Sequence, residues 1–252
     1  MSNPFSLAGR RAMVTGANTG IGQGIALSMA AAGAEVLVVG RSSMAATEAA
    51  IRAAGGRVAS IQADLGQTST VAAMFDRAWD EHGPIDILVN NAGIIRRAAA
   101  VDFTEADWDD VMDVNLKSVF LLCQAMARRA FAAARPARIV NVASLLSFQG
   151  GIRVASYTAS KSGLAGLTKL LANEWAAKGI NVNAIAPGYI ETNNTEALRN
   201  DPERSSDILK RIPAGRWGSP ADIGGTAVYL ASDAAAYVHG AILPVDGGWL
   251  GR

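Results

Sequence analysis

Residues 15–22 read Thr-Gly-Ala-Asn-Thr-Gly-Ile-Gly and follow directly on a short apolar run, Ala12–Thr15. The glycines Gly16, Gly20 and Gly22 allow a backbone to turn tightly and to approach a phosphate group closely. The helical pattern behind them supplies free N–H groups and the positive end of a helix dipole. The spacing is not Gly-x-Gly-x-x-Gly, so the glycines alone would also fit an ordinary strand-to-helix turn. The strand before and the helix after favour a phosphate cradle in the first βαβ unit of a nucleotide-binding sheet.

Short apolar runs alternate with amphipathic segments along the whole chain. The runs expected to be strands are Ala12–Thr15, Glu35–Val39, Val58–Gln62, Ile85–Asn90, Arg138–Ala143, Asn181–Ala186 and Ile242–Val245. The segments expected to be helical include Gln23–Ala32, Ser69–Glu81, Asp107–Ala134 and one that begins at Ser219. Brief, mostly apolar runs suit strands that are buried on both faces of a parallel sheet. The alternation predicts the α/β class, as a Rossmann-type doubly wound parallel sheet with helices on both faces.

No break in composition marks a second domain. We expect one domain over residues 1–252, with a cofactor half at about 8–145 and the catalytic helix, a lid and the C-terminal strand at about 146–252. The stretch Tyr189–Pro213 is polar and interrupts the alternation, which predicts a mobile lid.

The composition argues against several classes of protein. The net charge is +1 and no run of Lys or Arg could follow a phosphate backbone, so nucleic acid is not an expected partner. The single cysteine, Cys123, excludes an intramolecular disulfide and a thiol metal cluster, and its apolar neighbours favour a buried structural thiol. No apolar stretch approaches the about 20 residues needed to span a bilayer, and the N-terminus lacks the features of a signal peptide. We therefore expect a soluble, cytoplasmic protein with no bound metal.

The end of the second predicted strand bears on the choice of nucleotide. An acidic residue at this place often accepts hydrogen bonds from the 2′-hydroxyl of a ribose, but here Gly40 is followed by Arg41. A guanidinium could pair with a 2′-phosphate, which favours NADP(H) over NAD(H). Alternatively, Arg41 stacks on adenine or points into water.

Polar residues that could carry chemistry also lie where predicted strands end. Ser144 follows the fifth strand, and Tyr157 and Lys161 are four residues apart, on one face of a helix. A free tyrosine, with a pKa of about 10, is a poor base at neutral pH, and a nearby ammonium would lower that pKa. Ser144 could then hold the oxygen of a substrate while a hydride moves. A Tyr–Lys pair at this spacing is usually just two exposed residues on a helix surface, and the sequence Asn-Asn-Ala-Gly at 90–93 could be a simple turn. The functional interpretation therefore depends on the combination of these features and on their order along the chain.

Together these motifs resemble the short-chain dehydrogenase/reductase family over essentially the whole chain. The stretch at 15–22 looks like the cofactor turn of that family, Asn-Asn-Ala-Gly at 90–93 like its sheet-stabilising motif, and Tyr157-Thr-Ala-Ser-Lys161 like its active-site Tyr-x-x-x-Lys. The resemblance implies that Ser144 polarises the substrate and that Tyr157 is the acid–base group. It also implies that Lys161 contacts the nicotinamide ribose and tunes Tyr157, and that Asn115 helps to hold a proton-relay water.

The resemblance further implies where an NAD(P) cofactor binds. Asp64 and Leu65 would lie beside adenine, and Pro187, Gly188 and Thr192 near the carboxamide. The full set of expected cofactor-binding residues is Gly16, Asn18, Thr19, Gly20, Ile21, Gly22, Arg41, Asp64, Leu65, Asn91, Ala92, Gly93, Tyr157, Lys161, Pro187, Gly188, Ile190 and Thr192. A homotetramer is also implied, in which the Tyr157 helix and the C-terminal strand pack against neighbouring subunits.

A narrower resemblance, to the sugar-acid dehydrogenases of this family, covers residues 94–97, 145–153, 192–195, 212–218 and 246–250. It implies a substrate such as 2-dehydro-3-deoxy-D-gluconate or 2-deoxy-D-gluconate, although Arg41 would not be expected in such an enzyme if it used NAD. The candidates for binding the substrate are Arg96, Arg97 and Arg153 for the carboxylate, and Gln149, Asn193 and Asn194 for hydroxyl groups. Each arginine could instead be solvated or lie at a subunit interface.

Alternative functions remain at this stage. The chain could be a gluconate 5-dehydrogenase, or a 3-oxoacyl carrier-protein reductase, which would need an apolar channel and a basic docking patch. A catalytically silent cofactor sensor is a further alternative, but such a protein would usually have lost Tyr157 or Lys161. Trp217 and Trp249 could line the pocket, and packing in the core or at an interface is their more common role.

Overall fold

The computed structural model describes residues 3–251, and its centre is a seven-stranded, fully parallel sheet. The strand order is β3-β2-β1-β4-β5-β6-β7. The chain therefore starts in the middle of the sheet, builds one half outward and returns to build the other, which is the doubly wound arrangement that was predicted. The strands are β1 (Arg11–Thr15), β2 (Glu35–Gly40), β3 (Val58–Gln62), β4 (Ile87–Asn90), β5 (Ala137–Val142), β6 (Ile180–Pro187) and β7 (Ile242–Val245).

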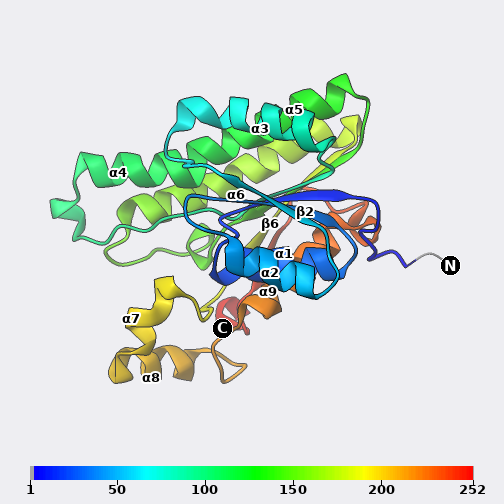
Figure 1. Ribbon diagram of the computed structural model, residues 1–252. Helices are drawn as coiled ribbons and strands as arrows, with labels where there is room; N and C mark the ends of the chain where they lie inside the picture. Colours follow the sequence, from blue (N-terminus) through cyan, green and yellow to red (C-terminus); the bar gives the residue numbers. More distant parts are fainter. Residues whose placement is uncertain (1–2, 252) are drawn as a thin grey trace.

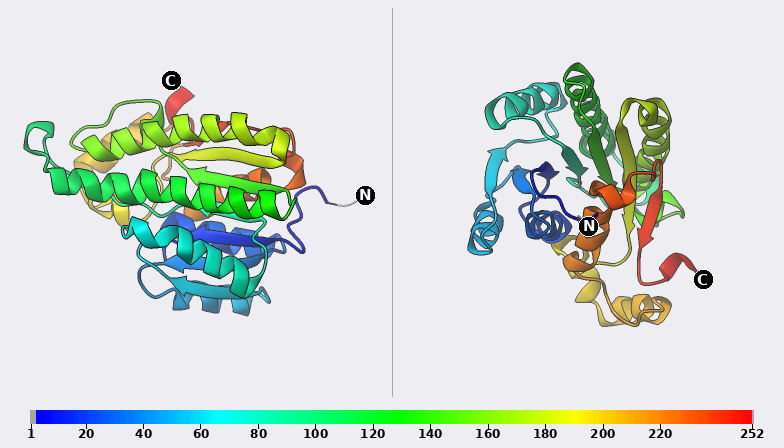
Figure 2. Two further views of the ribbon diagram at one scale, coloured as in Figure 1. Left: turned by 90° about the horizontal axis from the view of Figure 1, so that it is seen from above. Right: turned by 90° about the vertical axis from the view of Figure 1, so that its right-hand side faces the viewer.

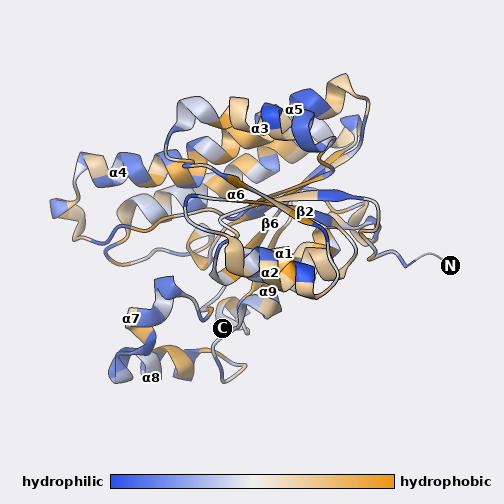
Figure 3. Ribbon diagram, in the orientation of Figure 1, coloured by the Kyte–Doolittle hydropathy of each residue, from blue (hydrophilic) through white to orange (hydrophobic). Residues whose placement is uncertain are grey.

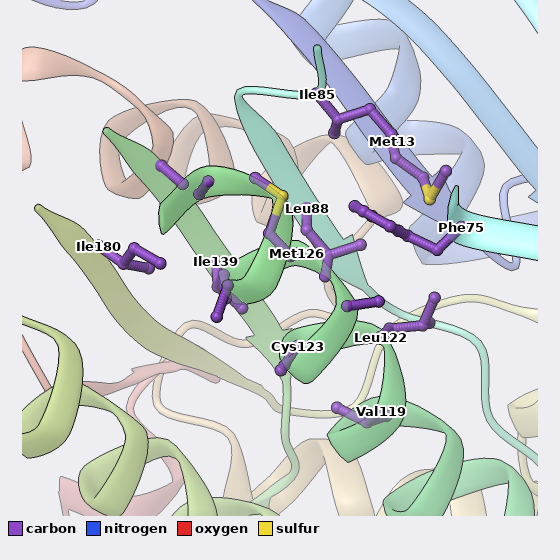
Figure 4. Packing of buried hydrophobic residues seen from close by; sticks show 14 of the residues in the cluster. Met13, Phe75, Ile85, Leu88, Val119, Leu122, Cys123, Met126, Ile139 and Ile180 are labelled. Carbon is purple, nitrogen blue, oxygen red and sulfur yellow. The ribbon is translucent and has the colours of Figure 1, made fainter. Parts of the chain in front are cut away.

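Helices cover both faces of this sheet, as Figures 1 and 2 show. One face carries α1 (Gly20–Ala31), α2 (Ala45–Ala53) and α9 (Pro220–Ala231). The other carries α3 (Thr68–His82), α5 (Ser118–Ala132) and α6 (Ala155–Trp175). Each layer has its own apolar core. Figure 4 shows the core beneath α3 and α5, where Phe75, Leu122 and Met126 are fully buried against the sheet.

Cys123 lies inside this same core. It is fully buried, and burial raises the pKa of its thiol to about 12, against a smaller lowering by the hydrogen bond from Asn90. At neutral pH such a group stays protonated and behaves as a small apolar side chain. The expected structural thiol is therefore what the structure contains.

Several elements differ in their bounds from the sequence expectations, and three of the differences are larger changes. The segment expected at Asp107–Ala134 is divided into α4 (Glu105–Met112), a π-helical turn η2 (Asp113–Lys117) and α5, because one wider turn interrupts the α-helical hydrogen bonding. The helix α2 was not among the segments named as helical from the sequence, and of its residues only Thr47 and Ile51, on one face, are buried. The strand β4 starts at Ile87 rather than at Ile85, although Ile85 is buried.

The polar stretch Tyr189–Pro213 is not a bare loop. It contains a 3-10 turn η5 (Asn193–Thr195) and the helices α7 (Glu196–Arg199) and α8 (Pro202–Arg211). The side chain of Asp201 accepts hydrogen bonds from the backbone N–H groups of Glu203 and Arg204 and so caps α8. Figures 1 and 3 show α7 and α8 as largely hydrophilic elements that stand away from the sheet.

None of the helices within residues 3–251 is long and apolar enough to cross a membrane.

Candidate active site

A groove with a volume of about 370 Å³ runs along the carboxyl ends of the parallel strands. Ligands bind at this edge of open α/β sheets, where loops from different strands converge. Every residue that the sequence suggested for the cofactor lines the groove, from Gly16 in the first turn to Thr192 after β6. Ser144, Asn193 and Asn194 line it as well.

The glycine turn leaves space that no other residue would leave. Gly16 and Gly20 have φ angles of +64° and +57°, in the left-handed region that side chains disfavour. A Cβ on Gly22 would lie 2.2 Å from the carbonyl oxygen of Gly16 and 2.3 Å from Nδ2 of Asn91. The backbone can therefore approach a ligand closely at the first turn of α1, where N–H groups without helical partners are available for phosphate oxygens. These residues fit the pyrophosphate of a dinucleotide.

Asn91 braces the same turn from the neighbouring strand. Its Nδ2 donates to the carbonyl oxygens of Thr15 at 3.0 Å and Gly16 at 3.2 Å. The hydroxyl of Thr15 in turn accepts from the N–H groups of Asn91 and Ala92, at 3.0 and 3.1 Å. Thr15 was not singled out from the sequence, because a threonine at a strand end carries no signal until its partner strand is known.

At the adenine end of the groove, Arg41 is exposed directly after β2. Its carbonyl oxygen accepts a hydrogen bond from Gln62, while within residues 3–251 no acidic side chain forms an ion pair with its guanidinium. Asn18 donates to the hydroxyl of Ser42 beside it at 2.9 Å. The guanidinium is therefore available for an anion.

Ser144, Tyr157 and Lys161 come together at the other end. The hydroxyl of Ser144 lies near enough to the phenol of Tyr157 to lower its pKa. Lys161 lies one turn further along α6, with Nζ 5.7 Å from the centre of the tyrosine ring, and it donates to the carbonyl oxygen of Val142 at 2.6 Å. The end of β5 thus presents Ser144 and anchors the ammonium of Lys161. The helix α6 carries both Tyr157 and Lys161.

The electrostatics of the pair differ from the sequence expectation. Burial raises the pKa of Tyr157, and the hydrogen bond to Ser144 and the charge of Arg97 offset only part of this rise. Burial also lowers the pKa of Lys161 to about 8. The expected lowering of the tyrosine pKa by Lys161 is therefore not found, because desolvation of the phenolate outweighs the nearby positive charges.

Asn115 lies behind the groove rather than in its lining. It is fully buried in the π-helical turn η2, where Oδ1 accepts from the N–H of Ile94 at 2.8 Å and Nδ2 donates to the carbonyl oxygen of Ile94 at 2.9 Å. Nδ2 also approaches the hydroxyl of Ser160 at 3.4 Å. Asn115 thus fixes the backbone after Gly93 and connects it to the helix that carries Tyr157.

The three candidate arginines have different surroundings. Arg96 forms ion pairs with Asp107 at 3.1 Å and Asp110 at 3.0 Å. Arg153 is exposed, with a φ angle of +62°. Arg97 donates to the carbonyl oxygen of Asn194 at 3.3 Å, and it is the arginine whose charge acts on Tyr157. Arg97 does not line the groove itself, but it contacts Asn194, which does.

The remaining polar candidates lie in two places. Asn193 and Asn194 belong to η5 and line the groove. Gln149 is half-buried in the loop after Ser144, and its Oε1 accepts from the indole nitrogen of Trp249 at 3.3 Å. Trp217 and Trp249 are buried and pack against the ring of Tyr189, so both have a packing role.

Comparisons with known proteins agree with this geometry. A family model described as enoyl-(acyl carrier protein) reductase matches residues 16–250. The chain is 56% identical to the 2-dehydro-3-deoxy-D-gluconate 5-dehydrogenase of Escherichia coli K12, over 98% of both chains, and 42% identical to the gluconate 5-dehydrogenase of Gluconobacter oxydans, again over 98% of both. A crystal structure of a provisionally assigned 2-deoxy-D-gluconate 3-dehydrogenase from Agrobacterium tumefaciens, with bound NADP, is 62% identical, covers both chains completely and superimposes with a TM-score of 0.95.

Proposed function

Because the chain belongs to the short-chain dehydrogenase/reductase family and is an NAD(P)-dependent oxidoreductase, we propose that its substrate is a deoxy sugar acid of the type 2-dehydro-3-deoxy-D-gluconate or 2-deoxy-D-gluconate. The observation that carries the proposal is the position of Arg97, an exposed arginine that donates at 3.3 Å to the carbonyl oxygen of Asn194 in the lining of the groove. The narrower resemblance in the sequence is to enzymes that act on such sugar acids. Three relatives named 2-dehydro-3-deoxy-D-gluconate 5-dehydrogenase, which are 54–56% identical to the chain, support it.

The chain's own residues suit proton transfer at an alcohol or ketone. A nicotinamide cofactor held in the groove would supply the acceptor or donor of the hydride. Ser144 holds the substrate oxygen by a hydrogen bond, and Tyr157 gives a proton to that oxygen during reduction or removes it during oxidation. A raised pKa keeps Tyr157 protonated at neutral pH, which suits the proton donor of a reduction. Lys161, fixed on the carbonyl oxygen of Val142, places a positive charge below the ring that stabilises the phenolate left behind.

Arg97 is the residue to which we assign the substrate carboxylate. A guanidinium can pair with a carboxylate through two hydrogen bonds, which fixes the orientation of the substrate as well as its charge. Arg96 is already paired with two aspartates. Neither Arg97 nor Arg153 lines the groove itself, but Arg97 is hydrogen-bonded to the lining residue Asn194, whereas within residues 3–251 no such bond joins the side chain of Arg153 to the lining. Asn193 and Asn194, which line the groove beside Arg97, would address hydroxyl groups.

For the cofactor we propose a preference for NADP(H). Arg41 follows directly after β2 and lines the groove, and the end of β2 carries no acidic residue that could accept bonds from a ribose hydroxyl. The similar structure from Agrobacterium tumefaciens contains NADP, which supports this choice.

For the assembly we propose a homotetramer. An apolar hollow lies on the outer surface of α5 and α6, where Phe120 is 38% and Leu170 is 49% exposed. Large apolar side chains grouped in this way on a helical face suit contact with a second subunit. The cytoplasmic location expected from the sequence stays a prediction.

The experiment that tests the proposed function is a matrix of initial rates. NADP(H) and NAD(H) are each combined with 2-dehydro-3-deoxy-D-gluconate, 2-deoxy-D-gluconate, D-gluconate and a 3-oxoacyl thioester, and absorbance of the reduced nicotinamide is followed. The highest kcat/KM is expected for a deoxy sugar acid with NADP(H). D-Gluconate is the second candidate, given the relative that is 42% identical, and a higher kcat/KM with it would replace the first assignment.

A further inference from the structure

Trp249, near the C-terminus, is held on three sides. It is only 4% exposed. The ring centre of Tyr189 lies 4.7 Å from that of the indole, and the guanidinium of Arg211 lies 4.0 Å from the indole ring centre. The indole nitrogen donates to Oε1 of Gln149. One side chain therefore joins the loop after β5, the segment after β6 and the last turn of α8, an element that Figure 1 labels.

The turn that carries Trp249 is itself fixed against the wall of the groove. Asp246 accepts hydrogen bonds from the N–H groups of Gly248 at 2.8 Å and Leu250 at 2.9 Å. A Cβ on Gly188, which lines the groove, would lie 2.6 Å from Cα of Asp246. The indole thus has little freedom to move relative to the groove.

The chemistry of an indole decides which way Gln149 faces. An indole nitrogen can donate a hydrogen bond but cannot accept one, whereas the amide of glutamine has one accepting and one donating end. The oxygen of Gln149 must therefore face Trp249, and the NH₂ group faces away from it. Without this contact both orientations of the amide would be available.

Gln149 lies one turn beyond the residue that holds the substrate oxygen. The N–H of Ser147 donates to the carbonyl oxygen of Ser144 at 2.9 Å, and the N–H of Gln149 donates to that of Leu145 at 3.1 Å. Leu145 is buried in the same apolar cluster as Trp249. The loop is therefore wound tightly from Ser144 to Gln149, and the amide is fixed relative to the catalytic serine.

We propose that Trp249 is a positioning residue, which turns the amide of Gln149 so that its NH₂ group donates to a hydroxyl oxygen of the sugar acid. This role rests on the proposed function. It explains why a tryptophan is useful at a position where phenylalanine would give the same stacking on Tyr189 and Arg211. The proposal also assigns a different residue to each end of the substrate. Arg97 would pair with the carboxylate, and Gln149, a neutral donor, would bind an uncharged hydroxyl oxygen.

The test is a double-mutant cycle of Trp249→Phe and Gln149→Met, measured with the best sugar acid of the wild-type protein. Trp249→Phe keeps the ring and removes the N–H donor, so the amide is oriented correctly only about half of the time and KM is expected to rise about twofold, while kcat stays at the wild-type value. Gln149→Met should raise KM by a similar factor or more. In the Gln149→Met background, Trp249→Phe should then raise KM no further. Trp217→Phe is the matched control, because that indole packs on the same Tyr189 ring, and its KM should stay at the wild-type value.

The possible failures can be told apart. Equal effects of Trp249→Phe in both backgrounds, or an unchanged KM in the single variant, would contradict the positioning role. A lower melting temperature with a lower kcat at constant KM would show that the indole only stabilises the fold, and would also overturn the proposal. If the wild-type protein turns over no sugar acid with either cofactor, the proposed function itself fails and this role with it.

Discussion

The ammonium of Lys161 is hydrogen-bonded to the carbonyl oxygen of Val142 at 2.6 Å, and no hydrogen bond within residues 3–251 joins it to Tyr157. Val142 ends β5, two residues before Ser144, so the backbone that presents the serine also anchors the lysine. The lysine therefore acts on the tyrosine ring from a fixed position 5.7 Å from its centre, through its field. Its pKa of about 8 means that this field weakens as pH rises above neutrality.

Replacement of Lys161 should remove most of the activity. Lys161→Met leaves the carbonyl oxygen of Val142 without its buried partner and removes the positive charge beside Tyr157. We expect kcat/KM to fall by about 10²–10⁴-fold, the usual contribution of acid–base catalysis, as measured by steady-state kinetics. Lys169→Met, on the exposed side of the same helix, is the control and should retain activity. A loss of less than tenfold in Lys161→Met would contradict the assigned role.

The pH profile should report the raised pKa of Tyr157. Oxidation requires the phenolate, so kcat/KM for oxidation should keep rising with pH past the ordinary tyrosine pKa of about 10. Reduction requires the neutral phenol and should not decline across neutral pH for this reason. Removing the charge in Arg97→Met takes away one of the two influences that lower the pKa, so the rise should move to higher pH. Arg77→Met, on α3, removes an equal charge elsewhere, and a displacement of the same size in this variant would contradict a local effect.

The sequence was sufficient for features that depend on local pattern. The order of strands and helices followed from apolar periodicity. The glycine turn and Arg41 followed from their places at strand ends, and the other cofactor residues from the family resemblance; all of these residues line the groove of the structure. It was not sufficient for features that depend on long-range pairing. The brace between Asn91 and Thr15, the ion pairs of Arg96, and the contact of Trp249 with Gln149 join residues that are distant in the chain. The raised pKa of Tyr157 could not be predicted from the sequence either, because it is caused by burial, which depends on the whole fold.

Two glycine-to-alanine changes should act in opposite directions. In Gly22→Ala, the new Cβ would meet the backbone oxygen of Gly16 at 2.2 Å, so the phosphate turn must shift. NADP binding, measured by fluorescence titration, should weaken by at least about tenfold and the melting temperature should fall. In Gly225→Ala, on the exposed side of α9, nothing lies within 4 Å of the new Cβ. That variant should gain about 0.5–1 kcal/mol of stability and bind NADP as the wild type does. Unweakened binding in Gly22→Ala would show that the turn does not hold the phosphates.

The start of α9 should be sensitive to Asp222. Its carboxylate accepts from the N–H of Ser219 at 2.6 Å and forms two bonds of 2.8 Å with Arg216, and these contacts hold its pKa well below the usual range. Asp222→Asn should therefore lower the free energy of unfolding by about 1 kcal/mol at neutral pH, measured by urea denaturation. Because the folded pKa is depressed, this stabilisation is fully present above pH of about 4 and is lost only as pH falls further. Asp207→Asn, an exposed ion-pair residue in α8, should change stability by less than about 0.5 kcal/mol. Equal effects of the two changes would contradict the capping role.

The choice between cofactors should depend on Arg41. A guanidinium that pairs with the 2′-phosphate contributes a charge-assisted bond, whereas NAD offers it only a hydroxyl. Arg41→Met should therefore weaken NADP binding by about 10- to 100-fold and leave NAD binding within about threefold, as measured by the dissociation constants of both cofactors. Arg52→Met, on the neighbouring α2, controls for a general loss of positive charge near the groove. If Arg41 instead stacks on the adenine that both cofactors share, Arg41→Met will weaken both to the same degree. An equal loss would therefore reject the 2′-phosphate contact while leaving Arg41 in the cofactor site.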